Sequence, residues 1–98
     1  MTDFETAQKV FQALKLAEYA PAQKALPILN GLMSLVQGAG DQPLKIEEAR
    51  ASAFLAICEV GKALHRRQPT DGLYAAAISA TERWMALVRA LTRNAATQ

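Results

Sequence analysis

Apolar residues recur at intervals of three and four in four segments of the 98-residue chain. This spacing is typical of one face of an α-helix. The stripes are Phe4, Ala7, Phe11 and Leu14, with Val10 and Ala17 beside them; Leu26, Leu29, Leu32, Met33 and Val36; Ile46, Ala49, Ala53, Ile57, Val60 and Leu64; and Leu73, Ala77, Ala80, Trp84, Leu87 and Leu91. The pattern predicts helices over residues 3–19, 22–37, 46–67 and 71–93, with a frayed tail over 94–98.

Residues typical of turns and helix ends separate these segments. Gly38 is placed for a left-handed C-cap after the second helix, and Thr70 or Asp71 is expected to cap the fourth. Pro27 leaves two alternatives for the second segment, because proline removes an amide donor from a helix interior. Either a helix begins near Pro27, or one helix runs through it with a kink.

Short connections between the segments imply antiparallel neighbours, so the sequence predicts one all-α domain over residues 1–98, a compact antiparallel up-and-down four-helix bundle. Composition agrees with this fold. The chain is 51% hydrophobic but only 6% aromatic, and alanine and leucine, both strong helix formers, dominate its apolar residues. Trp84 is expected to be the large anchor of a core of small residues, whereas the sequence leaves open whether Tyr19, Tyr74 and Met85 are exposed.

The sequence offers little catalytic chemistry. Cys58 is the single cysteine and His65 the single histidine, so neither a disulfide nor a zinc site of the usual kind is expected. Cys58 is interpreted as a buried structural thiol. Ser34, Ser52 and Ser79 lack the surroundings of a nucleophilic serine. We therefore predict a protein that is not an enzyme, with no catalytic residue, cofactor or metal.

One short segment resembles an enzyme family of small helical proteins. Residues 59–63, Glu-Val-Gly-Lys-Ala, are similar to the lysine-bearing stretch of the chorismate mutases. The upstream arginine and the downstream acid and glutamine of that family have no convincing counterparts in this chain. The resemblance does not change the prediction of a protein without catalytic activity.

The charge of the chain disfavours nucleic acid as the main partner. Eleven Lys and Arg against nine Asp and Glu give a net charge of +2, far below the basic excess of a dedicated nucleic-acid-binding domain. A basic contact group is still present at the expected end of the third helix: Lys62, His65, Arg66 and Arg67. Antiparallel packing would place it roughly 25–30 Å from Arg89 and Arg93, so the basic residues should not form one continuous patch.

The second predicted helix carries more apolar residues than one face can bury. We predict a partner surface on it, made of Leu26, Ile28, Leu29, Leu32, Met33, Leu35 and Val36. The predicted function is a non-enzymatic adaptor or regulator that acts through protein–protein interaction with a partner the sequence does not identify. Self-association as a homodimer is one form of this.

Three alternative functions belong to other classes. Some bacteriocin immunity proteins are four-helix bundles of about this length, so an immunity-type protein that neutralises a toxin is similar in architecture. The basic contact group would serve a nucleic-acid-binding regulator. A small-ligand binder would need polar groups inside the bundle, for which Asn30, Ser34 and Ser52 are the candidates.

The expected location is the cytoplasm, without a membrane partner. The first residues are acidic and polar rather than basic and apolar, which is not the pattern of a signal peptide. No run approaches the roughly 18 apolar residues that a membrane span requires.

Overall fold

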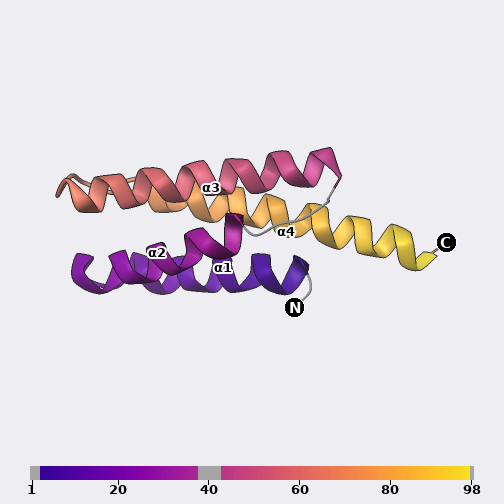
Figure 1. Cartoon of the computed structure of the whole chain (residues 1–98), viewed down its shortest axis with the longest axis horizontal. Coiled ribbons are helices and arrows are strands. Elements are labelled where there is room, and N and C mark those ends of the chain that lie inside the picture. The colour runs from indigo at the N-terminus through magenta and orange to yellow at the C-terminus, as the bar shows by residue number, and fades with distance from the viewer. Residues whose placement is uncertain (1–2, 38–42, 98) are drawn as a thin grey trace.

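The computed structural model describes residues 3–37 and 43–97, which form four α-helices and no strand. These are α1 (Asp3–Glu18), α2 (Ala22–Gln37), α3 (Leu44–His65) and α4 (Leu73–Thr97). The helices run alternately up and down the long axis (Figure 1). Among the described residues, α1 packs on α2, α2 on α3, α3 on α4 and α4 on α1, which closes a ring. The predicted all-α, up-and-down four-helix bundle is confirmed.

The ends of the helices lie close to the predicted positions, with one clear difference. α4 begins at Leu73, two residues later than expected, and continues to Thr97. The frayed tail was therefore wrongly predicted for residues 94–97, which are helical. Neither glycine nor proline interrupts this stretch, and its two alanines favour the helix. The predicted C-cap at Gly38 lies outside the described residues.

Pro27 lies inside a continuous α2, so a helix that begins near Pro27 is ruled out. α2 begins five residues earlier, at Ala22, and the carbonyl of Pro21 just before it accepts hydrogen bonds from the amides of Lys24 and Ala25, each at 2.9 Å. Pro27 has no amide to donate to the carbonyl of Gln23. Both residues are exposed, so the missing bond falls on the solvent side of the helix.

α3 ends in a Schellman motif with an unusual residue. The amide of Arg67 donates to the carbonyl of Leu64 at 3.2 Å, and the amide of Gln68 donates to the carbonyl of Ala63 at 2.7 Å. This pair of bonds requires a left-handed residue, which is usually glycine. Here the position is filled by Arg67, with a φ of 56°.

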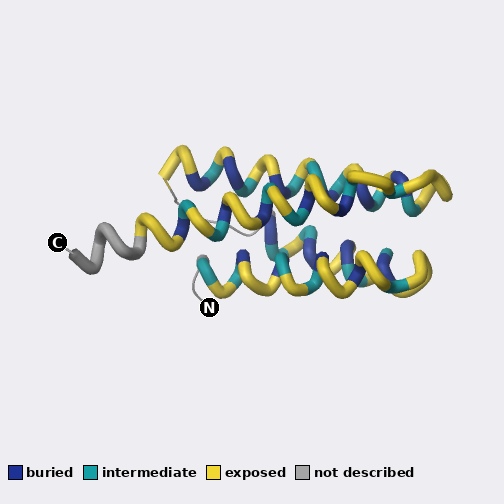
Figure 2. The backbone as a smooth tube through the Cα atoms, turned by 180° about the vertical axis from the view of Figure 1, so that it is seen from behind, coloured by how far each residue is buried: buried dark blue, intermediate teal, exposed yellow. Residues whose placement is uncertain are grey.

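The buried residues form one stripe along the inner side of each helix (Figure 2). Their spacing alternates mostly between three and four, the seven-residue pattern of helices that pack nearly parallel. They are Ala7, Val10, Leu14 and Ala17; Ala25, Leu29, Leu32 and Val36; Ile46, Ala49, Ala53, Ile57, Val60 and Ala63; and Tyr74, Ala77, Thr81, Trp84 and Val88. Since many of these residues are alanine, the helices can approach closely.

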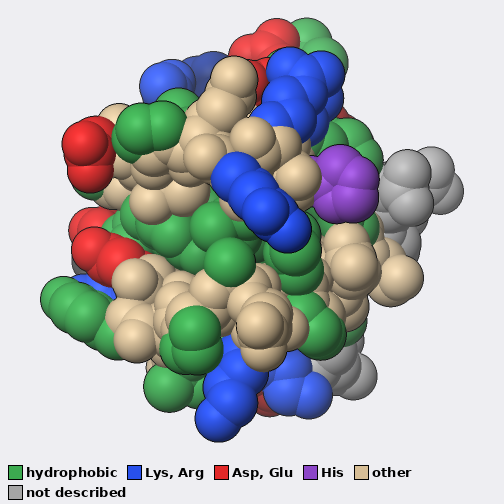
Figure 3. Space-filling model, turned by 90° about the vertical axis from the view of Figure 1, so that its left-hand side faces the viewer, with side chains coloured by type: hydrophobic (Ala, Val, Ile, Leu, Met, Phe, Trp, Pro, Cys, Tyr) green, Lys and Arg blue, Asp and Glu red, His purple; other side chains and the backbone are tan. Residues whose placement is uncertain are grey.

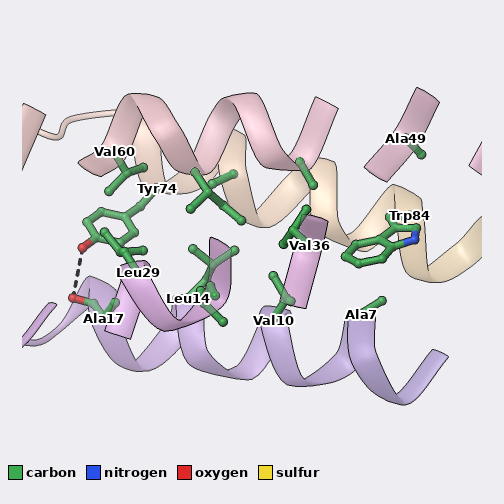
Figure 4. Close-up of a cluster of buried hydrophobic side chains, with 14 of the residues drawn as sticks. Ala7, Val10, Leu14, Ala17, Leu29, Val36, Ala49, Val60, Tyr74 and Trp84 are labelled. Atoms are coloured by element: carbon green, nitrogen blue, oxygen red, sulfur yellow. Dashed lines mark hydrogen bonds between the residues drawn. The ribbon is translucent and has the colours of Figure 1, made fainter. Parts of the chain in front are cut away.

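Trp84 is the largest side chain in the core and is only 1% exposed, as predicted. Ala7 of α1 and Ala49 of α3 lie on either side of its indole ring (Figure 4). Its Nε1 is buried and has no hydrogen-bond partner among the described residues. The small neighbours make room for the ring, and the indole N–H is left unsatisfied.

Tyr74 lies at the opposite end of the core and is buried, which the sequence left open. Its hydroxyl donates a hydrogen bond to the carbonyl of Ala17 at 3.2 Å, which ties α4 to the end of α1 (Figure 4). Burial raises the pKa of Tyr74 above its ordinary value of 10.0, and the nearby carboxylate of Glu18 raises it further. Of the other two residues whose exposure the sequence left open, Tyr19 is 86% exposed and Met85 is half-buried.

Arg50 joins α3 to the last turn of α2. Its Nη1 donates a hydrogen bond to the carbonyl of Val36 at 2.6 Å, and its Nη2 forms an ion pair with Glu47 one turn earlier. A cation near the carboxyl end of a helix interacts favourably with the helix dipole. Arg50 therefore holds α2 against α3 by a charged contact at the edge of the apolar core.

Candidate functional site

The partner surface predicted on the second helix is not one exposed patch. Three of its residues, Leu29, Leu32 and Val36, are at most 3% exposed and lie in the core, so the prediction is wrong for these three. The remaining four are half-buried: Leu26, Ile28, Met33 and Leu35. The last three pack against the core. The broad apolar face is covered because α2 packs on α1 at one side and on α3 at the other.

The basic contact group lies at the end of α3, and all four of its side chains, Lys62, His65, Arg66 and Arg67, are exposed. Lys62 Nζ is 3.6 Å from Glu59 Oε1, which offsets part of its charge. Figure 3 looks onto this end of the bundle, where hydrophobic and uncharged surface separates the Lys and Arg side chains. The Lys and Arg side chains visible on this end face therefore do not form one continuous basic patch.

The polar residues predicted inside the bundle are elsewhere. Asn30, Ser34 and Ser52 are all exposed, so they line no internal pocket. Among the side chains that the structure describes, Thr81 is polar and buried, and its hydroxyl donates to the carbonyl of Ala77 at 2.8 Å. Cys58 is half-buried rather than fully buried. Within the described residues, no three His, Cys, Asp or Glu side chains gather where they could hold a metal ion.

A groove of about 440 Å³ runs between α1 and α4 on the outside of the bundle. We call it the α1/α4 groove. It is lined by Phe4 and Phe11 of α1 and by Glu82, Met85, Ala86, Arg89 and Ala90 of α4. The two phenylalanines and Met85 are half-buried, and the other four residues are exposed. The groove thus has an apolar floor, with one acidic and one basic side chain.

Each of the two phenyl rings in this groove makes a cation–π contact with a basic side chain. The guanidinium carbon of Arg89 lies 4.9 Å from the centroid of the Phe4 ring, and Nζ of Lys15 lies 5.2 Å from that of Phe11. Such contacts contribute roughly 0.5–1 kcal/mol at exposed sites. Arg89 reaches from α4 to the Phe4 ring of α1 in this way, so its guanidinium lies at the groove.

Comparison with protein-family models, with curated proteins and with solved structures gave no match. The candidate site therefore rests on the side chains of this chain alone.

A second surface hollow of about 480 Å³ lies between α3 and α4 and differs in character. Its lining is Lys45, Glu48, Ala49, Ser52, Arg83 and Leu87. Charges of both signs are mixed here, and no aromatic ring contributes. The α1/α4 groove is the better candidate for binding, because aromatic residues, methionine and arginine are the types enriched in protein interfaces.

Within residues 3–37 and 43–97, no helix combines the length and the apolar character that a membrane crossing requires. The large exposed hydrophobic side chains among the described residues are Leu16, Tyr19, Leu44, Leu55 and Leu91. Exposed apolar side chains are common on the surfaces of globular proteins.

Proposed function

We propose that this protein is a non-enzymatic helical bundle that acts by binding another protein, and that the α1/α4 groove receives an amphipathic helix of that partner. The observation that supports this proposal is the gathering of two half-buried phenyl rings, Met85 and Arg89 in one groove. Laying the apolar face of a helix into such a groove is a recurring mode of peptide recognition.

The charges at the groove define the chemistry of the partner helix. Glu82 and Arg89 are seven residues apart on α4, which is about 10.5 Å at 1.5 Å per residue. A helix lying antiparallel to α4 would present a basic residue to Glu82 and, two turns away, an acidic residue to Arg89. Between them it would carry apolar side chains that contact Phe4, Phe11 and Met85.

The test compares the same substitution at two exposed alanines. Ala86→Glu introduces a carboxylate into the groove, and Ala51→Glu introduces one on the solvent face of α3. Glutamate is a good helix former, so neither change should disturb the fold, which circular dichroism would check. The matched pair separates the effect of the groove from that of added charge.

A photo-reactive amino acid at position 90 would crosslink the partner in native cells, mass spectrometry would identify it, and binding would be measured with purified protein. We expect Ala86→Glu to weaken that complex at least tenfold and Ala51→Glu to leave it unchanged. Equal affinities of the two variants would show that the groove is not the binding surface. Failure to crosslink any protein at position 90 would also contradict the proposal.

A further inference from the structure

One outward face of α4 has charges that are arranged symmetrically. Glu82, Met85, Ala86 and Arg89 follow one another at spacings of three, one and three, so they share one side of the helix. The midpoint between Glu82 and Arg89 coincides with the midpoint between Met85 and Ala86. Glu82, Ala86 and Arg89 are exposed and Met85 is half-buried, and all four line the α1/α4 groove.

A helix with this arrangement is complementary to an antiparallel copy of itself. With a two-fold axis at that midpoint, Glu82 of each copy faces Arg89 of the other, and Met85 of each faces Ala86 of the other. A two-fold dimer uses the same patch on both subunits, so self-complementarity is its defining requirement. Ala86, together with Ala90 one turn further on, is small enough to let two α4 helices approach closely.

We infer that the helix that occupies the α1/α4 groove is α4 of a second copy of this chain, in an antiparallel two-fold dimer. This inference rests on the proposed function and specifies its partner. The second copy meets the chemistry set out for the partner, because its Arg89 is the basic residue facing Glu82 and its Glu82 is the acidic residue facing Arg89. In return, Phe4 and Phe11 of each subunit flank the α4 helix of the other.

The size of the groove sets the strength expected of the dimer. Seven residues line it on each subunit, whereas a standard stable interface uses about 20–30 residues a side. The dimer should therefore be weak, with a Kd above about 1 µM. It should also weaken as salt is added, since charges at the surface are screened by salt.

Charge exchange tests the arrangement directly. Glu82→Arg places arginine against arginine at both symmetry-related contacts, and Arg89→Glu places glutamate against glutamate. Each variant alone should dimerise at least about tenfold more weakly than the wild type, since two attractive pairs become repulsive. An equimolar mixture of the two should restore dimerisation as a heterodimer, and the double variant should restore the homodimer.

Sedimentation velocity at low salt measures the dimerisation of the purified wild type, of each variant and of the mixture. The protein concentration runs from about 10 µM to 1 mM, a range chosen around the affinity expected for a small interface. Glu59→Arg and Arg66→Glu are the matched controls, because they make the same charge changes at exposed positions of α3 and beyond its end. These controls should dimerise as the wild type does. Circular dichroism would verify that every variant is folded.

Three results would overturn the dimer: a wild-type chain that stays monomeric up to 1 mM, single variants as strong as their controls, or a mixture that fails to restore association. Other results decide whether the proposed function holds. If the wild-type chain is monomeric but binds a different protein in a manner that Ala86→Glu abolishes, the dimer is refuted and the groove remains a binding site. If Ala86→Glu affects neither association nor partner binding, both proposals fail.

Discussion

The turn after α3 places an arginine in a backbone conformation that most residues avoid. Arg67 has a φ of 56°, and the left-handed region costs an L-residue roughly 1–2 kcal/mol. Glycine pays no such cost, although it loses about 0.5–1 kcal/mol more conformational entropy than other residues on folding. The difference predicts that Arg67→Gly stabilises the protein by about 0.5–1 kcal/mol.

The neighbouring arginine provides the matched control. Arg66 has a φ of −89° and a ψ of 3°, which an L-residue adopts without the left-handed penalty. Arg66→Gly should therefore only add flexibility to the unfolded chain and destabilise the protein by about 0.5–1 kcal/mol. Both residues are exposed and each substitution removes one positive charge from the same turn. Electrostatic effects should largely cancel when the two are compared.

The assay is urea unfolding followed by far-ultraviolet circular dichroism and by the fluorescence of Trp84, the single tryptophan. In a domain of this size, 1 kcal/mol corresponds to about 4–8 °C in Tm, so thermal unfolding also resolves the effect. An Arg67→Gly protein no more stable than the Arg66→Gly protein would refute the assignment of strain to this turn. A stabilised Arg67→Gly variant that has lost partner binding would instead show that the strain is retained for function.

Three further predictions address other contacts. Tyr74→Phe removes a buried hydrogen bond and should cost about 0.5–1.5 kcal/mol in urea unfolding at pH 7, with Tyr19→Phe as the exposed control. Because the pKa of Tyr74 is raised in the folded state, its contribution is intact below pH 10 and is lost as the pH rises toward the folded pKa; stability measured above pH 10 should fall less steeply in the Phe variant. Arg50→Ala breaks a hydrogen bond and an ion pair and should lower the free energy of unfolding by about 1.5–3 kcal/mol, and an unchanged urea midpoint would contradict the role given to this residue. Pro27→Ala restores the amide that can donate to the carbonyl of Gln23 and should raise Tm by several degrees, whereas a lower Tm would show that proline suits this position better than alanine.

The sequence predicted the four helices and their up-and-down arrangement, but not the rotation of α4 about its axis. Its apolar pattern favoured Leu73, Ala80 and Leu87 for the core, whereas the buried stripe passes through Tyr74, Thr81 and Val88. Both stripes share Ala77 and Trp84, so the buried face is rotated by less than the roughly 100° that separates successive residues of a helix. The prediction was based on the spacing of strongly apolar side chains, so it left out Thr81 and Tyr74.

Hydrogen bonds explain why Thr81 and Tyr74 can be buried in the core. The hydroxyl of Thr81 is satisfied by the carbonyl of Ala77 in its own helix, and that of Tyr74 by Ala17 in another helix. A buried hydroxyl is tolerated when it finds such a partner. The bond made by Thr81 is local and can be anticipated from sequence, since threonine often bonds back to a carbonyl four residues earlier. The bond made by Tyr74 spans 57 residues and depends on the tertiary structure.

The second helix shows the opposite error, because residues that were expected to be exposed are covered by neighbouring helices. Its excess of apolar residues was interpreted as an exposed surface, because a single helix buries only one stripe. In the bundle, α2 contacts neighbours on two sides, and these take up residues at the edges of the stripe such as Ile28 and Met33. How much of a broad apolar face remains exposed depends on the angle between its neighbours, which the sequence of the helix does not contain.

The α1/α4 groove follows from the same small residues that allow the helices to pack closely. The core stripe of α1 runs through Ala7, Val10 and Ala17, and the phenyl rings of Phe4 and Phe11 are displaced to its edge. An alanine-rich interface has little space for rings at its centre, because its helices lie close together. Rings at the edge then contribute apolar surface beside α4. Substitutions that loosen the core between α1 and α4 should therefore impair folding and binding together, whereas changes at exposed Ala86 should affect binding alone.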